Sequence, residues 1–159
     1  MQFAKDSFYV TLRERLAEVN PARTTVVDGV LRPAVVVGEN ESSDIAALDG
    51  TFRLSWGECA NVGGGSKLMK MSCTIDYMTP GTVGTGGDRG RLLGTMDGEL
   101  MAISRPLRAV KSDYAKVPPV SMGTQMFWTD LEFAAPKDKA GRMSRTASTT
   151  VYFVSEVKE

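Results

Sequence analysis

The sequence contains no histidine, so it lacks the side chain that most often acts as a general base and most often binds a metal ion. Its two cysteines, Cys59 and Cys73, do not form a Cys-x-x-Cys pair. Two thiolates cannot by themselves complete a tetrahedral zinc site. The sequence therefore predicts no metal, no cofactor, no catalytic residues and no enzymatic activity.

Long hydrophobic runs are absent as well. No stretch of about 18 apolar residues, the length expected of a membrane-spanning helix, occurs in the chain. The first residues, MQFAKDSFYV, lack the apolar region of a secretory signal peptide. We therefore expect synthesis inside a cell, no membrane partner, and free thiols at both cysteines, with a disulfide between them as the less favoured alternative.

Net charge is also lacking, because 19 lysines and arginines balance 19 aspartates and glutamates. Such a chain has no overall field that attracts nucleic acid or acidic lipid, so we expect no sequence-specific nucleic-acid partner. Its 159 residues suffice for one domain that buries a core without a disulfide or a metal. The whole chain, residues 1–159, is predicted to be that domain.

The first segment with a clear pattern is an amphipathic helix. Asp6 or Ser7 is expected to cap its start, and Asn20-Pro21 stops it after Val19. Its apolar side chains recur at helical spacing and form one stripe: Phe8, Leu12, Leu16 and Val19.

Strand patterns follow. Apolar and polar residues alternate from Met69 to Tyr77, which predicts a strand with its odd-numbered face in the core. Asp28-Gly29 between β-branched runs predicts a hairpin with a type I′ turn. Further strands are expected at residues 35–37, 52–56, 125–133 and 145–157. With the second helix described below, the order predicts an α+β domain: a mainly antiparallel or mixed sheet of about five to six strands, with two amphipathic helices packed on it.

A glycine-rich stretch, TPGTVGTGGDRG, joins the Met69–Tyr77 strand to the second helix, where many proteins bind a phosphate. Gly87 stands where a P-loop needs lysine, and Arg89 stands where a dinucleotide-binding loop needs its third glycine. Asp88 is expected to cap the helix and to occupy the positive end of its dipole. We therefore interpret residues 79–87 as a connection without phosphate chemistry.

The second helix carries an apolar stripe and a glycine stripe on opposite sides. Leu92, Met96, Leu100 and Ile103 form the apolar stripe. Gly90, Gly94 and Gly98 recur on the other side, although each interior glycine costs about 0.5–1 kcal/mol relative to alanine. Either this side is simply solvated, or the backbone of a neighbouring subunit lies close to it.

Residues 104–124 show no clear hydrophobic period, which predicts a long extended segment. Its charged residues are all basic except Asp113. Residues 38–50 are acidic and contain no basic residue. The basic segment either covers its own domain or meets the acidic segment of the next subunit, a head-to-tail contact that can close a ring. Under the second hypothesis the candidate inter-subunit contacts are Arg105, Arg108, Lys111, Tyr114, Lys116, Glu39, Glu41, Asp44, Gly94 and Gly98.

In element order and size the chain resembles the tail terminator (tail completion) proteins of tailed bacteriophages and of related phage-tail-like particles. The resemblance rests on the helix DSFYVTLRERLAEVNPA, the strand LMKMSCTIDYM, the helix DRGRLLGTMDGELMAI and the closing strand TASTTVYFVSEV. Members of that family have an α/β fold, form hexameric rings on the end of the tail tube, stop its growth and provide the surface that joins it to the head or neck. Residues 104–124 depart from the family's pattern.

The resemblance implies a structural protein of the virion tail or neck, assembled in the cytoplasm of a bacterial host. Its expected partners are further copies of itself, the tail tube protein, and neck or connector proteins. Another neck or head–tail connector ring protein is the alternative. A small nucleotide-binding α/β protein that uses residues 79–88 is the third candidate.

Overall fold

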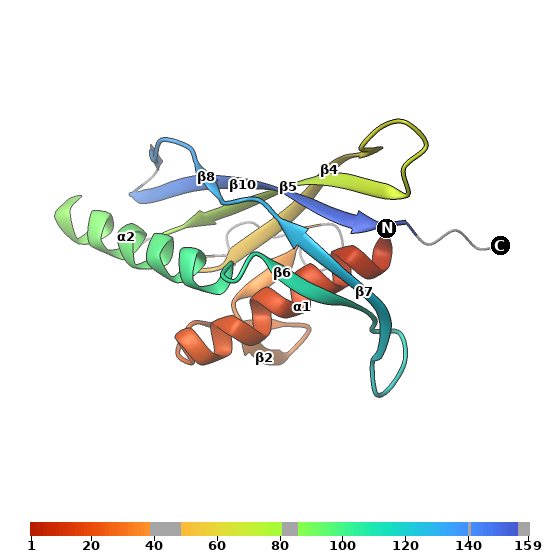
Figure 1. Cartoon of the computed structure of the whole chain (residues 1–159). Helices are drawn as coiled ribbons and strands as arrows, with labels where there is room; N and C mark the ends of the chain where they lie inside the picture. Colours follow the sequence, from red (N-terminus) through yellow and green to blue (C-terminus); the bar gives the residue numbers. More distant parts are fainter. Residues whose placement is uncertain (39–48, 81–85, 140, 156–159) are drawn as a thin grey trace.

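The computed structural model describes residues 1–38, 49–80, 86–139 and 141–155. Helix α1 (Gln2–Val19) and helix α2 (Gly86–Ile103) lie below strands β4, β5 and β10 in the view of Figure 1. The buried apolar side chains of both helices and of the large sheet form one continuous core. The α+β domain predicted from the sequence is confirmed.

The large sheet has the strand order β3-β4-β5-β10-β7-β6, and β8 and β9 pair with the earlier part of β10. Its strands are β3 (Val35–Val37), β4 (Phe52–Asn61), β5 (Leu68–Met78), β6 (Arg108–Asp113), β7 (Val120–Trp128), β8 (Glu132–Phe133), β9 (Lys137–Lys139) and β10 (Arg142–Val154). Strand β3 runs parallel to β4, and the other pairs in the described part of the chain are antiparallel. The sheet has eight strands where about five to six were expected.

A separate two-stranded sheet, β1 (Thr24–Val27) and β2 (Val30–Pro33), forms the predicted hairpin. Asp28 has φ 50° and Gly29 has φ 77°, the positive values that a type I′ turn requires at both central positions. Val27 on this hairpin packs with the fully buried Val36 of β3. The hairpin therefore covers the face of β3 that points away from the main core.

The segment predicted as a long aperiodic stretch is largely a β-hairpin. Strands β6 and β7 pair antiparallel from Arg108–Phe127 to Asp113–Val120. The register shifts between Val110 and Ser112, and Gly123 has φ 70°, so a regular alternation is not visible in the sequence. The prediction of a strand at residues 125–133 was wrong in its bounds, because β7 starts earlier, ends at Trp128, and is followed by the short β8.

The start of α1 also differs from the prediction. The helix begins at Gln2, so neither Asp6 nor Ser7 caps it. Ser7 is buried inside the helix, where its hydroxyl donates to the carbonyl of Phe3 (2.6 Å) and accepts from the backbone N–H of Ser112 on β6 (2.9 Å). The Ser7 hydroxyl therefore pairs with a backbone N–H of the edge strand β6 and does not cap the start of α1.

Helix α1 is the centre of the fold, because it contacts both β3 and β6, the two edge strands of the large sheet. The sheet thus curls around the helix. The ring of the fully buried Phe8 meets Trp56 of β4 and Trp128 of β7 edge to face, at centroid distances of 5.6 and 5.1 Å. Val19, expected in the apolar stripe, is 46% exposed at the end of the helix.

The predicted apolar stripe of α2 is confirmed at Met96, Leu100 and Ile103 and wrong at its first position. Leu92 is 39% exposed, and the neighbouring Leu93 is buried instead. The buried side chains of the helix are Leu93, Met96, Glu99, Leu100 and Ile103. Because the helix already begins at Gly86, Asp88 lies in its first turn and is not its N-cap.

Strand β5 confirms the predicted alternation. Its buried side chains are Met71, Cys73, Ile75 and Tyr77. Replacing Ile75 by alanine is expected to lower the free energy of unfolding by about 2–5 kcal/mol, because it leaves a cavity in the core. The matched change Thr74→Ala on the other face should alter it by no more than about 0.5 kcal/mol. Urea denaturation of both variants checks this; equal losses would show that the assigned faces are wrong.

Candidate interaction site

The predicted inter-subunit residues of the basic segment do not form one surface. Arg105 follows α2 and pairs with Asp130 at 2.8 Å, with both side chains about two-thirds exposed. Arg108, at the start of β6, is exposed, as is Lys116 beyond the end of β6. These three cations remain accessible to a partner.

Lys111 and Tyr114 do not fit the prediction of exposed contacts. Lys111 is 3% exposed, and its ammonium group donates to the carbonyl of Val154 on β10 at 2.7 Å. Tyr114 is half-buried and packs against the core, and burial raises its pKa. Lys111 follows the exposed Val110 on β6, so the alternation of the strand points it inward. Without the strand assignment, the sequence gives no signal for this orientation.

The acidic candidates Glu39, Glu41 and Asp44 lie outside the described residues. Asp49, which closes the acidic segment, accepts two hydrogen bonds from Arg142 of β10, at 2.8 and 2.9 Å. This pair fixes the start of β10 to the end of the acidic segment within one chain. The Asp49 carboxylate therefore has its partner, Arg142, within its own chain.

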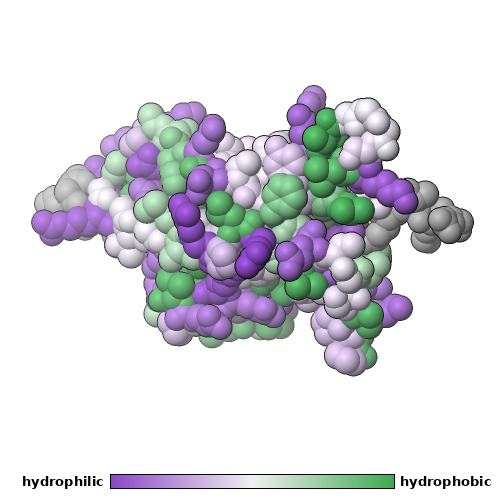
Figure 2. Space-filling model, viewed as in Figure 1, coloured by the Kyte–Doolittle hydropathy of each residue, from purple (hydrophilic) through white to green (hydrophobic). Residues whose placement is uncertain are grey.

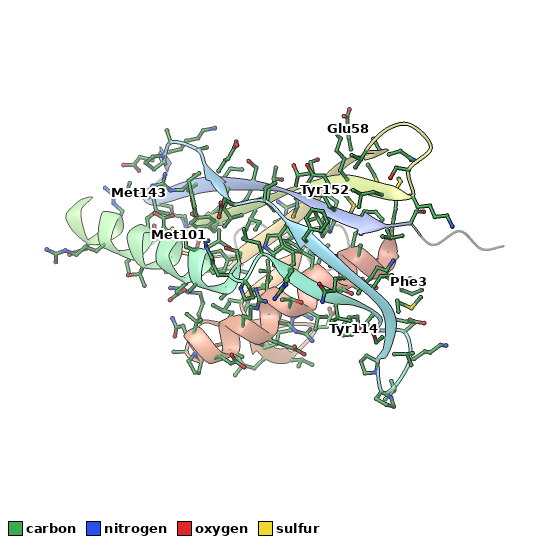
Figure 3. The ribbon with its side chains drawn as sticks, viewed as in Figure 1. Phe3, Glu58, Met101, Tyr114, Met143 and Tyr152 are labelled. Carbon is green, nitrogen blue, oxygen red and sulfur yellow. The ribbon has the colours of Figure 1, made fainter. Side chains whose placement is uncertain are left out.

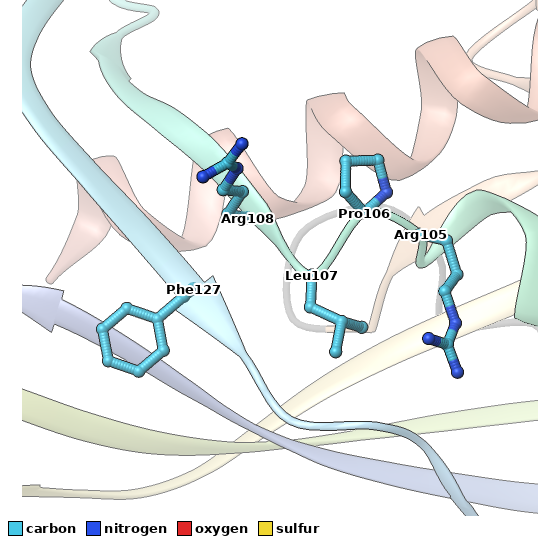
Figure 4. Close-up of a pocket in the computed structure, with 5 residues that line it drawn as sticks. All are labelled: Arg105, Pro106, Leu107, Arg108 and Phe127. Atoms are coloured by element: carbon cyan, nitrogen blue, oxygen red, sulfur yellow. The ribbon is translucent and has the colours of Figure 1, made fainter.

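A hollow of about 620 Å³ opens where α2 passes into β6. Its lining residues are Arg105, Pro106, Leu107, Arg108 and Phe127, shown in Figure 4. The Leu107 side chain lies between the two arginines along the chain, and Phe127 faces the hollow from β7. The hollow therefore combines an apolar floor with guanidinium groups.

The backbone beneath this hollow is fixed by Arg15 of α1. The guanidinium of Arg15 donates to the carbonyls of Ile103 (3.0 Å), Pro106 (3.1 Å) and Arg108 (3.4 Å) and lies over the ring of Trp128. Such a bridge satisfies three backbone carbonyls near the edge of the sheet. The backbone that carries the hollow is thus held by a side chain of its own chain.

Phe127 forms the wall of the hollow, and its ring stacks on Tyr152 of β10 at a centroid distance of 4.9 Å and an interplanar angle of 9°. Figure 3 shows Tyr152 where β7 and β10 meet. Phe127 nevertheless remains 46% exposed. An aromatic ring held in place but still exposed is an efficient contact for an apolar group.

A second, smaller hollow of about 110 Å³ adjoins the first and shares Arg105 with it. Its lining residues are Met101, Ser104, Arg105, Asp130, Leu131 and Phe133. Met101, labelled on α2 in Figure 3, is 50% exposed. Together the two hollows make a surface that reaches from the end of α2 to the end of β7.

The β6–β7 hairpin projects away from the helices and the rest of the sheet (Figure 1). Its tip carries Val117, which is 97% exposed, beside Pro118 and Pro119. Val110 on β6 and Val120 on β7 are 49% and 46% exposed. Figure 2 shows hydrophobic residues among the polar ones on this projection, at the lower right.

The glycine side of α2 is open. Apart from the adjoining residues and backbone of α2 itself, a Cβ atom added at Gly90, Gly94 or Gly98 would meet no atom of the described chain within 4 Å. A close backbone approach at Gly94 and Gly98 therefore does not come from the described part of this chain. Both interpretations of the glycine stripe, a solvated face and a contact with another subunit, stay open.

Cys59 and Cys73 are free, and burial raises the pKa of the Cys73 thiol, which keeps it neutral. In the ranges that the structure describes, no group of three or more histidine, cysteine, aspartate or glutamate side chains could hold a metal ion. Neither described helix is long and apolar enough to cross a membrane. Residues 81–85 of the glycine-rich stretch lie outside the described ranges.

No protein-family model matches the chain, and no curated protein matches its sequence.

Proposed function

We propose that this chain is a structural protein that forms a hexameric ring, caps the end of a phage-type tail tube, ends its growth and provides the surface that joins the tube to the head or neck. The protein acts by assembly and has no catalytic role. It works in the tail or neck of the virion, after assembly in the host cytoplasm. Its partners are further copies of itself, the tube protein and neck proteins.

The observation that carries the proposal is the projecting β6–β7 hairpin. A monomer gains nothing from holding Val117 almost wholly in water at the end of a two-stranded arm. Burying such a side chain against a neighbour contributes about 1.5–3 kcal/mol. The order of elements also supports the proposal. A helix, a strand pair, further strands ending in the long β5, a second helix and closing strands succeed one another, and this is the order in which the chain resembles tail terminator proteins.

A ring whose partner is another connector rather than the tube is the second candidate. The same hairpin and the same apolar surfaces would serve it. Electron microscopy of the protein mixed with tail tubes alone tells the two apart, because a terminator ring would sit on the tube ends and a ring that binds only other connectors would not.

Substituting Val117 by glutamate is expected to weaken ring formation strongly and to leave the fold of the monomer unchanged, because this side chain is 97% exposed. Sedimentation velocity and negative-stain electron microscopy, without and with cognate tail tubes, measure the effect. Val62→Glu is the matched control, since Val62 is an exposed valine in the β4–β5 turn. A wild-type chain that stays monomeric both alone and with tubes would refute the proposed function.

A further inference from the structure

We propose that the hollow between Arg108 and Phe127 is the docking site for residues 39–48 of a second copy of this chain. The inference rests on the proposed function, because it names the contact that joins neighbouring subunits of the ring. It differs from a contact between two charged segments, since the main anchor is an apolar side chain seated on Phe127 and Leu107.

The chemistry of the hollow defines its occupant. Leu107 and the exposed side of Phe127 offer apolar surface, and the guanidinium of Arg108 forms no ion pair among the described residues. Arg105 at the other side already pairs with Asp130. A suitable ligand is therefore an extended segment that carries an apolar side chain close to a carboxylate.

Residues 39–48 have this composition. Their sequence, ENESSDIAAL, contains three carboxylates and no basic residue, and Asp44 directly precedes Ile45. Ile45 can fill the hollow while Asp44 or Glu41 pairs with Arg108. Charge complementarity and the apolar anchor thus point to the same segment.

Within one chain, the end of this segment is attached far from the hollow. Asp49 is bound to Arg142 at the start of β10, whereas Phe127 lies opposite Tyr152, ten residues further along that strand. Ten residues of an antiparallel strand span about 33 Å. Ile45 is four residues from Asp49, and those four residues span at most about 14 Å when fully extended. The extended chain thus covers less than half of that separation, so the occupant that we assign is the segment of a second copy, which is not tethered to this Arg142.

Photo-crosslinking tests the contact directly. Phe127 is replaced by p-benzoylphenylalanine, and equal amounts of unlabelled and ¹⁵N-labelled protein are mixed under assembly conditions and irradiated. Mass spectrometry is expected to find crosslinks between copies that join position 127 to the peptide containing residues 39–48. The same analogue at Val62, which is also 46% exposed, is the matched control and should not give them.

Charge reversal gives a second, independent measurement. Arg108→Glu is expected to raise the protein concentration needed for half-assembly about tenfold, and adding Glu41→Arg and Asp44→Arg should restore part of the loss. Lys67→Glu, an exposed lysine in the β4–β5 turn, is the control and should leave assembly unchanged. Lys111 is left unaltered because it is buried.

The outcomes separate the two proposals. If rings form but position 127 crosslinks only within its own copy or to another segment, the docking site is wrong while ring formation stands. The same conclusion follows if Arg108→Glu assembles like the wild type. If the wild-type chain forms no ring alone or with tubes and no crosslinks between copies arise, both proposals fail.

Discussion

Replacing Phe8 by alanine is expected to lower the free energy of unfolding by about 3–5 kcal/mol, one of the two largest losses foreseen for this chain. Phe8 is fully buried and contacts Trp56 on β4 and Trp128 on β7, strands from the two halves of the curled sheet. Alanine would leave a cavity that both indole rings border. Two edge-to-face aromatic contacts would be lost at the same place, each contributing about 0.5–1.5 kcal/mol beyond the buried area.

The matched control is Phe8→Leu, which retains most of the volume and should cost less than the alanine variant. Urea denaturation followed by tryptophan fluorescence measures both, since Trp56 and Trp128 report on the site itself. If Phe8→Ala lost less than about 1 kcal/mol, α1 would not be the centre around which the sheet closes.

Replacing Glu99 by alanine is expected to cost about 3–5 kcal/mol, because it removes one partner of a buried ion pair. Glu99 on α2 is 8% exposed and accepts hydrogen bonds from Arg23, just before β1, and from the side chain of Asn20 at the end of α1 (2.6 Å). Arg23 also donates to the carbonyl of Gly50 at 3.2 Å. The Glu99 carboxylate thus links α2 to Asn20 at the end of α1 and, through Arg23, to Gly50 before β4.

A double variant separates the ion pair from the general effect of truncation. Arg23→Met combined with Glu99→Leu removes both charges and retains apolar volume, so it should lose less than Glu99→Ala alone. Chemical denaturation of the wild type, of Glu99→Ala and of the double variant gives the three free energies of unfolding to compare. A double variant that lost as much stability as Glu99→Ala alone would contradict the assigned pairing, because the loss would then not come from a buried charge left without its partner.

The sequence by itself determined the elements whose signals are local. The alternation from Met69 to Tyr77 predicted β5 and its buried face, since successive side chains of a strand point to opposite sides. Asp28-Gly29 predicted the hairpin turn, because both residues must adopt positive φ there. The helical spacing of apolar residues predicted α1 and α2, and their order along the chain predicted the α+β class.

The roles of individual side chains were decided by tertiary structure. From the sequence, Ser7 looks like a helix cap and Arg15 like a solvent-facing residue of a surface helix. The sheet curls around α1, and both side chains pair with backbone groups near its edge. Lys111 looks like a rim charge, but β10 supplies a carbonyl for it inside the fold. In each case the deciding partner is far away in the sequence, so no local pattern can reveal it.

At the candidate interaction site, too, some contact residues could be predicted from the sequence and others could not. Arg105 and Arg108 were predicted as contacts from the charge of their segment, and the structure leaves both accessible. Phe127 lay within the predicted strand at residues 125–133 but was not predicted as a contact, because only the pairing of β7 with β6 places it opposite Arg108. The hollow itself exists only because antiparallel pairing brings β7 back beside the start of β6. The sequence determined which residues are basic or apolar, and the long-range pairing of strands decided which of them share a surface.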